Sequence, residues 1–84
     1  MSVKILGRYI VSDPAICHGE PTFIGTRILV KDVLEQVESG IVWEAIIEEW
    51  RGVLSKEAIA EAIRLAREAL AAHTPEQMTE PACA

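Results

Sequence analysis

Cys17 and His18, two side chains capable of metal binding or nucleophilic chemistry, are adjacent in the sequence. A structural zinc site takes about four ligands, and the other Cys and His residues of the chain are His73 and Cys83. The two cysteines also lack the C-x-x-C spacing of a zinc or redox motif, and they do not suggest a disulfide framework. A Cys–His nucleophile would need a third group to orient the base, and none is evident. We therefore expect no metal site and no cofactor.

Other residue types with catalytic potential also lack the arrangement that a mechanism requires. Glu44, Glu48 and Glu49 recur on the outward face of a predicted helix, where a solvated surface is more common than an acid–base pair. The glycines around Gly25 do not have the spacing of a phosphate-binding loop. We therefore predict that the protein is not an enzyme and has no catalytic residue.

Basic side chains gather on one side of the last predicted helix. At 100° per residue, Lys56 and Arg67 fall within about 20° of each other, and Arg64 lies about 60° further round. Beside this basic lane runs an acidic lane of Glu57, Glu61 and Glu68. The pattern leaves two interpretations open. The basic lane could face the DNA major groove, or the two lanes could pair with each other, for instance Arg64 with Glu68.

Two further cations, Arg27 and Lys31, complete the set of candidate DNA contacts. Arg27 follows Gly25 and Thr26, so its guanidinium could either hold this turn together or bind a phosphate. The net charge of −5 counts against a generic nucleic-acid binder. The acidic residues are concentrated between positions 31 and 54. An anion-binding surface would therefore have to come from the first 30 residues and from the last helix.

The N-terminal part of the chain predicts one or two short strands. Residues 4–11 are rich in aliphatic side chains and precede the turn signal Ser12-Asp13-Pro14. Gly7 inside this strand suggests a bulge or a close backbone approach. With so few strands, an unpaired edge is expected, and pairing with a second copy of the chain would cover it. Phe23 and Ile24 predict a second short extended segment.

The rest of the chain predicts three helices. The first starts at Val30 and ends just before Gly40, the second spans about 43–50, and the third follows the cap Ser55 and runs to about Ala72. The expected core face of the third helix consists of Ile59, Ala62, Ile63, Ala66 and Leu70. The four residues 51–54 between the last two helices give the spacing of a helix-turn-helix. We therefore predict a mainly α, single domain over residues 1–72 and a flexible tail over 73–84.

Composition places the chain among small intracellular proteins. Its 84 residues are enough for one domain with a modest core. No apolar run approaches the roughly 18–20 residues of a membrane span, and no secretory signal is evident. We expect a soluble, cytoplasmic protein without membrane association.

The run from Asp13 to Val30 closely resembles the signature of the family known as domain of unknown function 433. The residues that carry the resemblance are Gly19, Pro21, Gly25, Thr26, Arg27 and Ile28. The likeness extends over about residues 8–70, with two departures. Val42 stands where members usually have a small polar residue before the second helix, and Trp50 is followed by Arg51 instead of proline.

The resemblance implies a homeodomain-like helix-turn-helix bundle. It also implies an antitoxin of a type II toxin–antitoxin pair, which would bind a PIN-like ribonuclease encoded by the adjacent gene. Such an antitoxin would act as a homodimer and could repress its own promoter by binding operator DNA. The alternative is a protein-interaction module that does not bind DNA and uses the helix-turn-helix as a scaffold.

Overall fold

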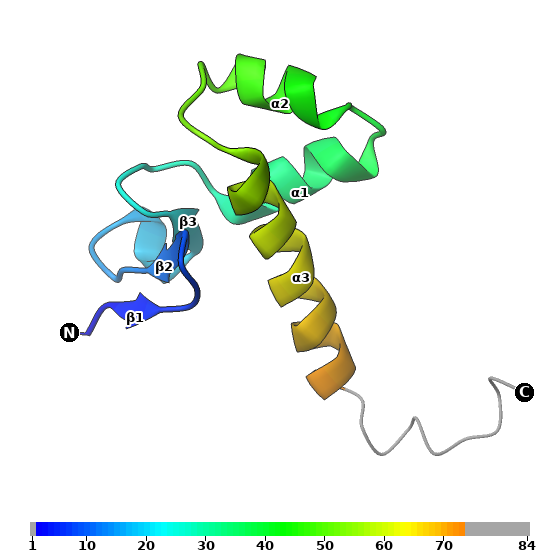
Figure 1. Cartoon of the computed structure of the whole chain (residues 1–84). Helices are drawn as coiled ribbons and strands as arrows, with labels where there is room; N and C mark the ends of the chain where they lie inside the picture. Colours follow the sequence, from blue (N-terminus) through cyan, green and yellow to red (C-terminus); the bar gives the residue numbers. More distant parts are fainter. Residues whose placement is uncertain (1, 74–84) are drawn as a thin grey trace, which may run out of the picture.

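The computed structural model describes residues 2–73, which form a small antiparallel sheet followed by three helices (Figure 1). The elements are β1 (Lys4–Ile5), β2 (Ile10–Ser12), the 3-10 turn η1 (Cys17–Gly19), β3 (Pro21–Phe23), α1 (Val30–Glu38), α2 (Trp43–Glu49) and α3 (Lys56–His73). The prediction of three helices after short strands is confirmed. The predicted tail lies outside the described residues except for His73, which ends α3. No helix among residues 2–73 has the length and apolarity needed to cross a bilayer.

The single strand predicted over residues 4–11 is wrong, because this segment folds back on itself as a hairpin. The sheet has the order β1-β2-β3, and Ile5 pairs with Val11, which pairs in turn with Thr22. Gly7 lies in the turn, where the N–H groups of Leu6 and Gly7 both donate to the carbonyl of Ile10, at 3.0 and 3.1 Å. The sequence interpretation overlooked that residues 6–9 can form a turn when a distant side chain binds the amides of Arg8 and Tyr9.

The helices end and begin largely where the local sequence predicts. After α1, Gly40 takes a φ of +85°, and Gly40 and Ile41 donate to the carbonyls of Val37 and Gln36, the pattern of a Schellman motif. Ser55 caps α3, since its Oγ accepts the N–H of Ala58 at 3.1 Å. The four residues between Trp50 and Ser55 form the predicted turn, in which Arg51 adopts a φ of +60°.

Val42 stands at the N-cap of α2 and provides no side-chain hydrogen bond there. Its side chain is also 62% exposed, so replacing it removes little packing. We expect Val42→Ser to raise the free energy of unfolding by about 1 kcal/mol, because a serine hydroxyl at this position can accept a backbone N–H of the first turn of α2. Urea unfolding followed by Trp fluorescence measures this. Val53→Ser, at an equally exposed valine outside a cap (59%), is the control and should change stability little.

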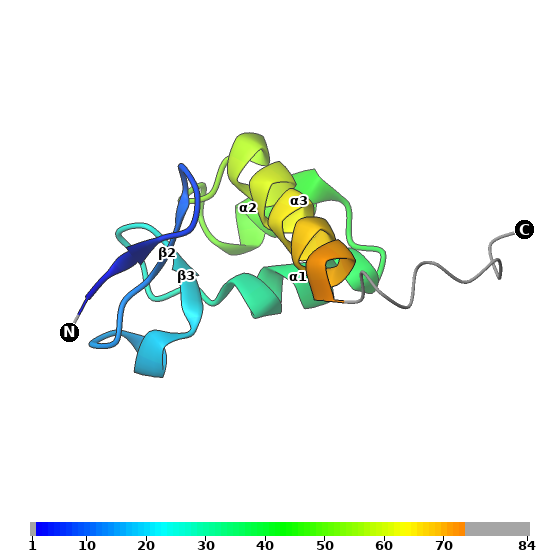
Figure 2. The same cartoon turned by 90° about the horizontal axis from the view of Figure 1, so that it is seen from below.

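The core lies where the sheet and the three helices meet. It consists of Ile10, Phe23, Val30, Val33, Ile46, Leu54, Ala58, Ile59 and Ala62. α3 packs against α1, α2 and β2, whereas α1 contacts β3 (Figure 2). Both tryptophans pack on this core, and Trp50 Nε1 donates to Gln36 Oε1 at 2.9 Å, which ties α2 to α1. Apart from Phe23, the buried core is aliphatic, and both tryptophans lie at its border.

α3 packs on the core with its N-terminal half only. Ile59 and Ala62 are buried as predicted, but Ala66 is exposed and Leu70 is 69% exposed. Their assignment to the core was wrong, because the helix continues beyond the body of the domain (Figure 1). The apolar face of its last turns therefore has no covering element among the described residues.

Candidate functional site

The glycine-containing turn between β3 and α1 is held by a threonine. The Thr26 hydroxyl donates to the carbonyl of Phe23 at 2.8 Å and accepts the N–H of Ile28 at 2.9 Å. Gly25 has a φ of +79°, a conformation that glycine adopts without strain. The Arg27 side chain is exposed and makes no hydrogen bond or ion pair within residues 2–73. The interpretation that Arg27 locks the turn is therefore wrong, and Thr26 has this role.

Cys17 and His18 lie in η1, where both have positive φ angles of 52° and 59°. Cys17 Sγ is 3.8 Å from the carbonyl oxygen of Arg27. The part of the chain that the structure describes contains no group of three or more Cys, His, Asp or Glu side chains suited to hold a metal ion. Cys83 lies outside the described residues.

The five candidate DNA contacts do not form one surface. Lys56 Nζ lies 3.3 Å from Glu44 Oε2 on α2, and Lys31 Nζ lies 3.8 Å from Glu20 Oε2. Arg64 bridges Glu61 at 3.3 Å and Glu68 at 3.8 Å. The Arg64 contacts agree with the interpretation that the two lanes pair, whereas Lys56 pairs with Glu44 of α2, outside the acidic lane. The pKa of Glu44 is lowered, first by its backbone hydrogen bond and then by Lys56.

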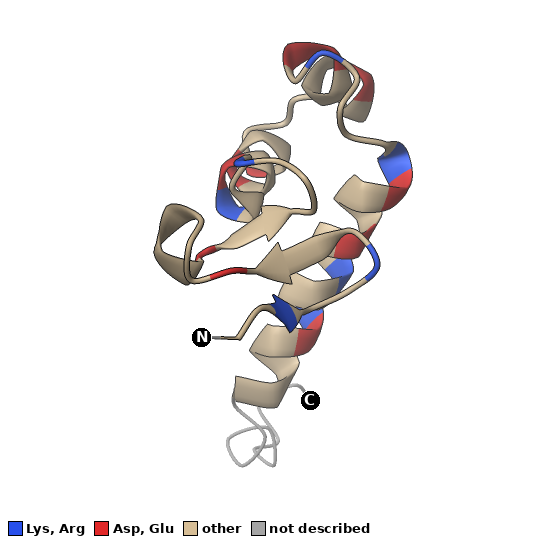
Figure 3. Ribbon diagram, turned by 90° about the vertical axis from the view of Figure 1, so that its left-hand side faces the viewer, with Lys and Arg blue, Asp and Glu red and all other residues tan. Residues whose placement is uncertain are grey.

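The structure adds a cation that sequence reasoning did not assign to this surface. Arg8, at the tip of the β1–β2 hairpin, lines the same open hollow as Arg64 and Arg67 of α3. Figure 3 shows the basic segments of α3 beside this hairpin tip. We call Arg8, Arg64 and Arg67 the arginine cluster. It joins the first and last segments of the chain, where the charge distribution indicated that an anion-binding surface would have to lie.

Glu61 holds the hairpin against α3. Its Oε1 accepts the N–H of Tyr9 at 2.7 Å, and its Oε2 accepts the N–H of Arg8 at 2.9 Å. A Cβ on Gly7 would lie only 2.6 Å from the Glu61 carboxyl carbon, so the predicted close backbone approach at Gly7 is confirmed. We call this arrangement the Glu61 clasp. It buries a carboxylate that is only 7% exposed.

The electrostatics of the clasp favour the ionised carboxylate. Burial raises the pKa of Glu61, but the hydrogen bonds from the amides of Tyr9 and Arg8 and the charge of Arg64 outweigh it, so the pKa is lowered overall. Sequence reasoning placed Glu61 in the acidic lane beside the basic lane and did not predict its contact with the hairpin. Its burial could have been inferred from the helical spacing. Ala58 and Leu65 lie three and four residues from Glu61, so Glu61 borders the apolar face of the helix.

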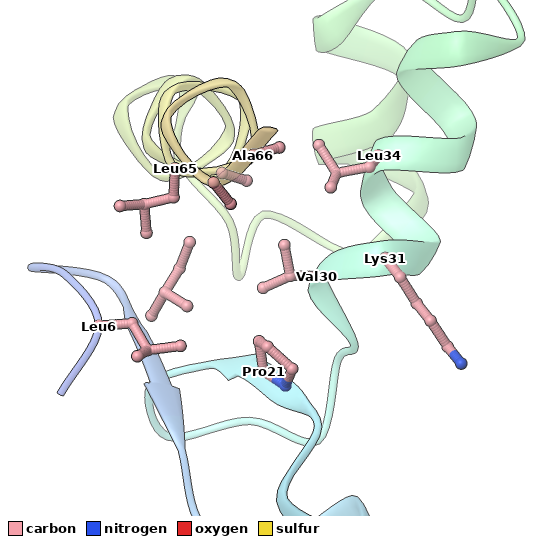
Figure 4. Close-up of a pocket in the computed structure, with 10 residues that line it drawn as sticks. Leu6, Pro21, Val30, Lys31, Leu34, Leu65 and Ala66 are labelled. Carbon is pink, nitrogen blue, oxygen red and sulfur yellow. The ribbon is translucent and has the colours of Figure 1, made fainter. Parts of the chain in front are cut away.

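An apolar groove runs between the sheet, α1 and the C-terminal half of α3 (Figure 4). Its volume is about 270 Å³, and its lining residues are Leu6, Ile10, Pro21, Val30, Lys31, Leu34, Ala62, Leu65, Ala66 and Ala69. Among the described residues, Lys31 is the one charged residue that lines it, and the ammonium group of Lys31 points away from the hollow (Figure 4). The groove continues onto the uncovered apolar turns of α3. It is therefore suited to an aliphatic segment of another protein.

Comparison with known proteins identifies the family. The chain belongs to the family described as Protein of unknown function (DUF433), whose model matches residues 10–66. The match covers both the glycine-containing turn and the three helices up to the middle of α3. Searches of curated proteins and of solved structures found no match to this chain.

Proposed function

We propose that this member of the DUF433 family is a non-catalytic antitoxin that binds and silences a PIN-like ribonuclease through the apolar groove. The observation that carries the proposal is the uncovered aliphatic surface formed by the groove and the last turns of α3. Exposed apolar surface that continues a core face is costly in water and is typical of a protein-binding site. The resemblance to antitoxin-like members of the family supplies the class of partner.

Charge supports the same class of partner. The acidic residues concentrate on α1 and α2, and the exposed ones include Glu35, Glu38, Glu48 and Glu49. A ribonuclease must attract the phosphates of its substrate and therefore carries basic surface. An acidic surface beside an apolar groove would complement such a partner and steer the encounter.

The proposal is tested by placing one charge on either side of α3. Ala69 lines the groove, whereas Ala71 lies about 200° further round the helix, and both are exposed. We expect Ala69→Arg to abolish co-purification with the protein encoded by the adjacent gene and to abolish relief of its toxicity. Ala71→Arg, the same substitution in the same helix, should retain both. Equal binding by the two variants, or a harmless neighbour that does not co-purify, would contradict the proposal.

The arginine cluster favours operator DNA as a second ligand. Arg8, Arg64 and Arg67 line one hollow together with Glu57 and Glu61. Arg64 is paired with Glu61 and Glu68, whereas Arg8 and Arg67 form no ion pair within residues 2–73. Three cations make few phosphate contacts, so useful affinity requires a dimer that presents two clusters. The alternative is an interaction module in which the same fold binds protein only.

Fluorescence anisotropy at low salt distinguishes these two functions. We expect the wild-type protein to prefer the DNA upstream of its own gene over random DNA, with affinity that decreases as salt increases. Arg67→Ala should weaken binding, whereas Arg27→Ala, at an exposed arginine outside the arginine cluster, should not. Absence of any preference for the upstream DNA would leave the protein-interaction module as the function.

A further inference from the structure

The sheet has one covered edge and one uncovered edge. The outer edge of β3 is covered by residues of the same chain. Thr22 forms a β-bridge with Leu29, and the N–H of Phe23 donates to the Ile28 carbonyl at 3.1 Å. β1 forms the opposite edge of the sheet. Within residues 2–73, no segment pairs with the outer side of β1. A strand edge of this kind presents unpaired backbone donors and acceptors.

The unpaired groups of β1 can be identified from the hairpin. The N–H of Leu6 donates to the Ile10 carbonyl, and hydrogen-bonded pairs alternate with non-bonded pairs along an antiparallel ladder. The pair Ile5–Val11 is therefore non-bonded, and the N–H and C=O of Ile5 point away from β2. The same alternation applies to Val3. Both side chains are also exposed, Ile5 by 70% and Val3 by 50%.

We propose that the outer edge of β1 is the homodimer interface, where a second copy adds its own β1 in antiparallel orientation. The register that fits best places Ile5 of one copy opposite Ile5 of the other. In this register both outward groups of Ile5 are bonded, and Lys4 lies opposite Leu6 of the other copy. Centring the pair on Lys4 instead would bring two ammonium groups face to face, which is unfavourable.

We assign a second copy of the chain to the β1 edge because the pairing is self-complementary and gives a closed dimer. A two-fold axis through the Ile5 pair uses the same residues on both sides, as an isologous interface requires. Because the β3 edges are already covered, the joined sheet ends at six strands and does not grow into a fibre. Leu6 connects this edge to the apolar groove, so exposed apolar surface continues from β1 to α3. The antiparallel pairing also places the two hairpin tips, with Arg8, at opposite ends.

Sedimentation velocity tests the interface on the full-length protein. We expect wild type to sediment as a dimer at micromolar concentration, with twice the monomer mass of 9.2 kDa. Ile5→Lys should give a folded monomer, whereas Ile24→Lys, at another exposed isoleucine (48%), should remain dimeric. Ile5→Pro keeps an uncharged residue but removes the outward N–H and the isoleucine side chain, and it should also give a monomer. Circular dichroism establishes that each variant is folded.

A cysteine cross-link tests the register. In a background with Cys17 and Cys83 replaced by serine, Ile5→Cys should form a disulfide-linked dimer, because directly opposite Cα atoms about 5.5 Å apart lie within disulfide range. Ile24→Cys should not. A wild-type protein that remains monomeric over the whole concentration range overturns the proposal. A dimer that persists in folded Ile5→Lys or Ile5→Pro overturns it equally, whether or not the toxin and DNA proposals hold.

Discussion

Replacing Gly7 by alanine is expected to lower the free energy of unfolding by about 2–4 kcal/mol, a large effect for one methyl group. The new Cβ would lie 2.6 Å from the carboxyl carbon of Glu61 and 2.7 Å from each of its oxygens. The carboxylate cannot withdraw without breaking its bonds to the amides of Arg8 and Tyr9. Urea unfolding monitored by Trp43 and Trp50 fluorescence measures the loss.

Two controls separate the collision from ordinary glycine effects. Gly25 has a φ of +79°, but no heavy atom lies within 4 Å of the position that a Cβ would take there. Gly25→Ala should therefore cost only about 1 kcal/mol of left-handed strain. In a Glu61→Ala background the space beside Gly7 is empty. Adding Gly7→Ala there should therefore lower the free energy of unfolding much less than it does in wild type. Additive effects in this double-mutant cycle would show that the collision is not the cause.

The Glu61 clasp itself gives the second large prediction. Glu61→Gln keeps the length of the side chain but replaces one acceptor oxygen by an NH₂ group. This group would face a backbone N–H of Arg8 or Tyr9, leaving a buried donor unsatisfied. We expect a loss of about 2–3 kcal/mol at neutral pH. Hydrogen exchange should be faster at the amides of Arg8 and Tyr9 than in wild type, while α1 remains protected.

The pH dependence of this loss follows from the lowered pKa of Glu61. A carboxyl group whose pKa is lower in the folded state stabilises the fold above its unfolded value, here the ordinary 4.5. That contribution disappears as the pH falls through the folded pKa. The stability difference between wild type and Glu61→Gln should therefore be largest near neutral pH and should shrink below about pH 4.5.

Glu44→Gln is the matched control for this pH dependence. Glu44 also has a lowered pKa and a lysine partner, but its side chain is 70% exposed. Solvent screening makes such surface pairs weak, so Glu44→Gln should have a much smaller effect at every pH. If both substitutions gave the same pH profile, burial of Glu61 would not be the source of the effect.

Short-range features of the fold were predictable because their determinants lie within a few residues. The helical spacing of Val30 and Val33 predicted α1, and Gly40 predicted its end, where the structure has a Schellman motif. Ser55 predicted the start of α3, which its hydroxyl caps. The same local reasoning failed at Leu70, because periodicity identifies an apolar face but not the point at which its covering ends. It failed also at residues 4–11, where the turn depends on a side chain of α3.

The candidate surfaces were less predictable because they depend on contacts between distant residues. The clasp joins Glu61 to amides 52 and 53 residues away, and the arginine cluster adds Arg8 to a lane predicted on α3 alone. The groove requires the sheet, α1 and α3 together. No local pattern encodes such contacts, since each depends on how complete elements pack.

By itself, the sequence determined the family, the three helices and the glycine-containing turn, because periodicity, caps and turn residues act over one or two turns of chain. Only the tertiary structure decided which charges are paired, which edge of the sheet is uncovered and which part of the apolar face of α3 is left without a partner. These outcomes depend on packing between elements that are far apart in sequence. They are also what the proposed binding to toxin, DNA and a second copy rests on.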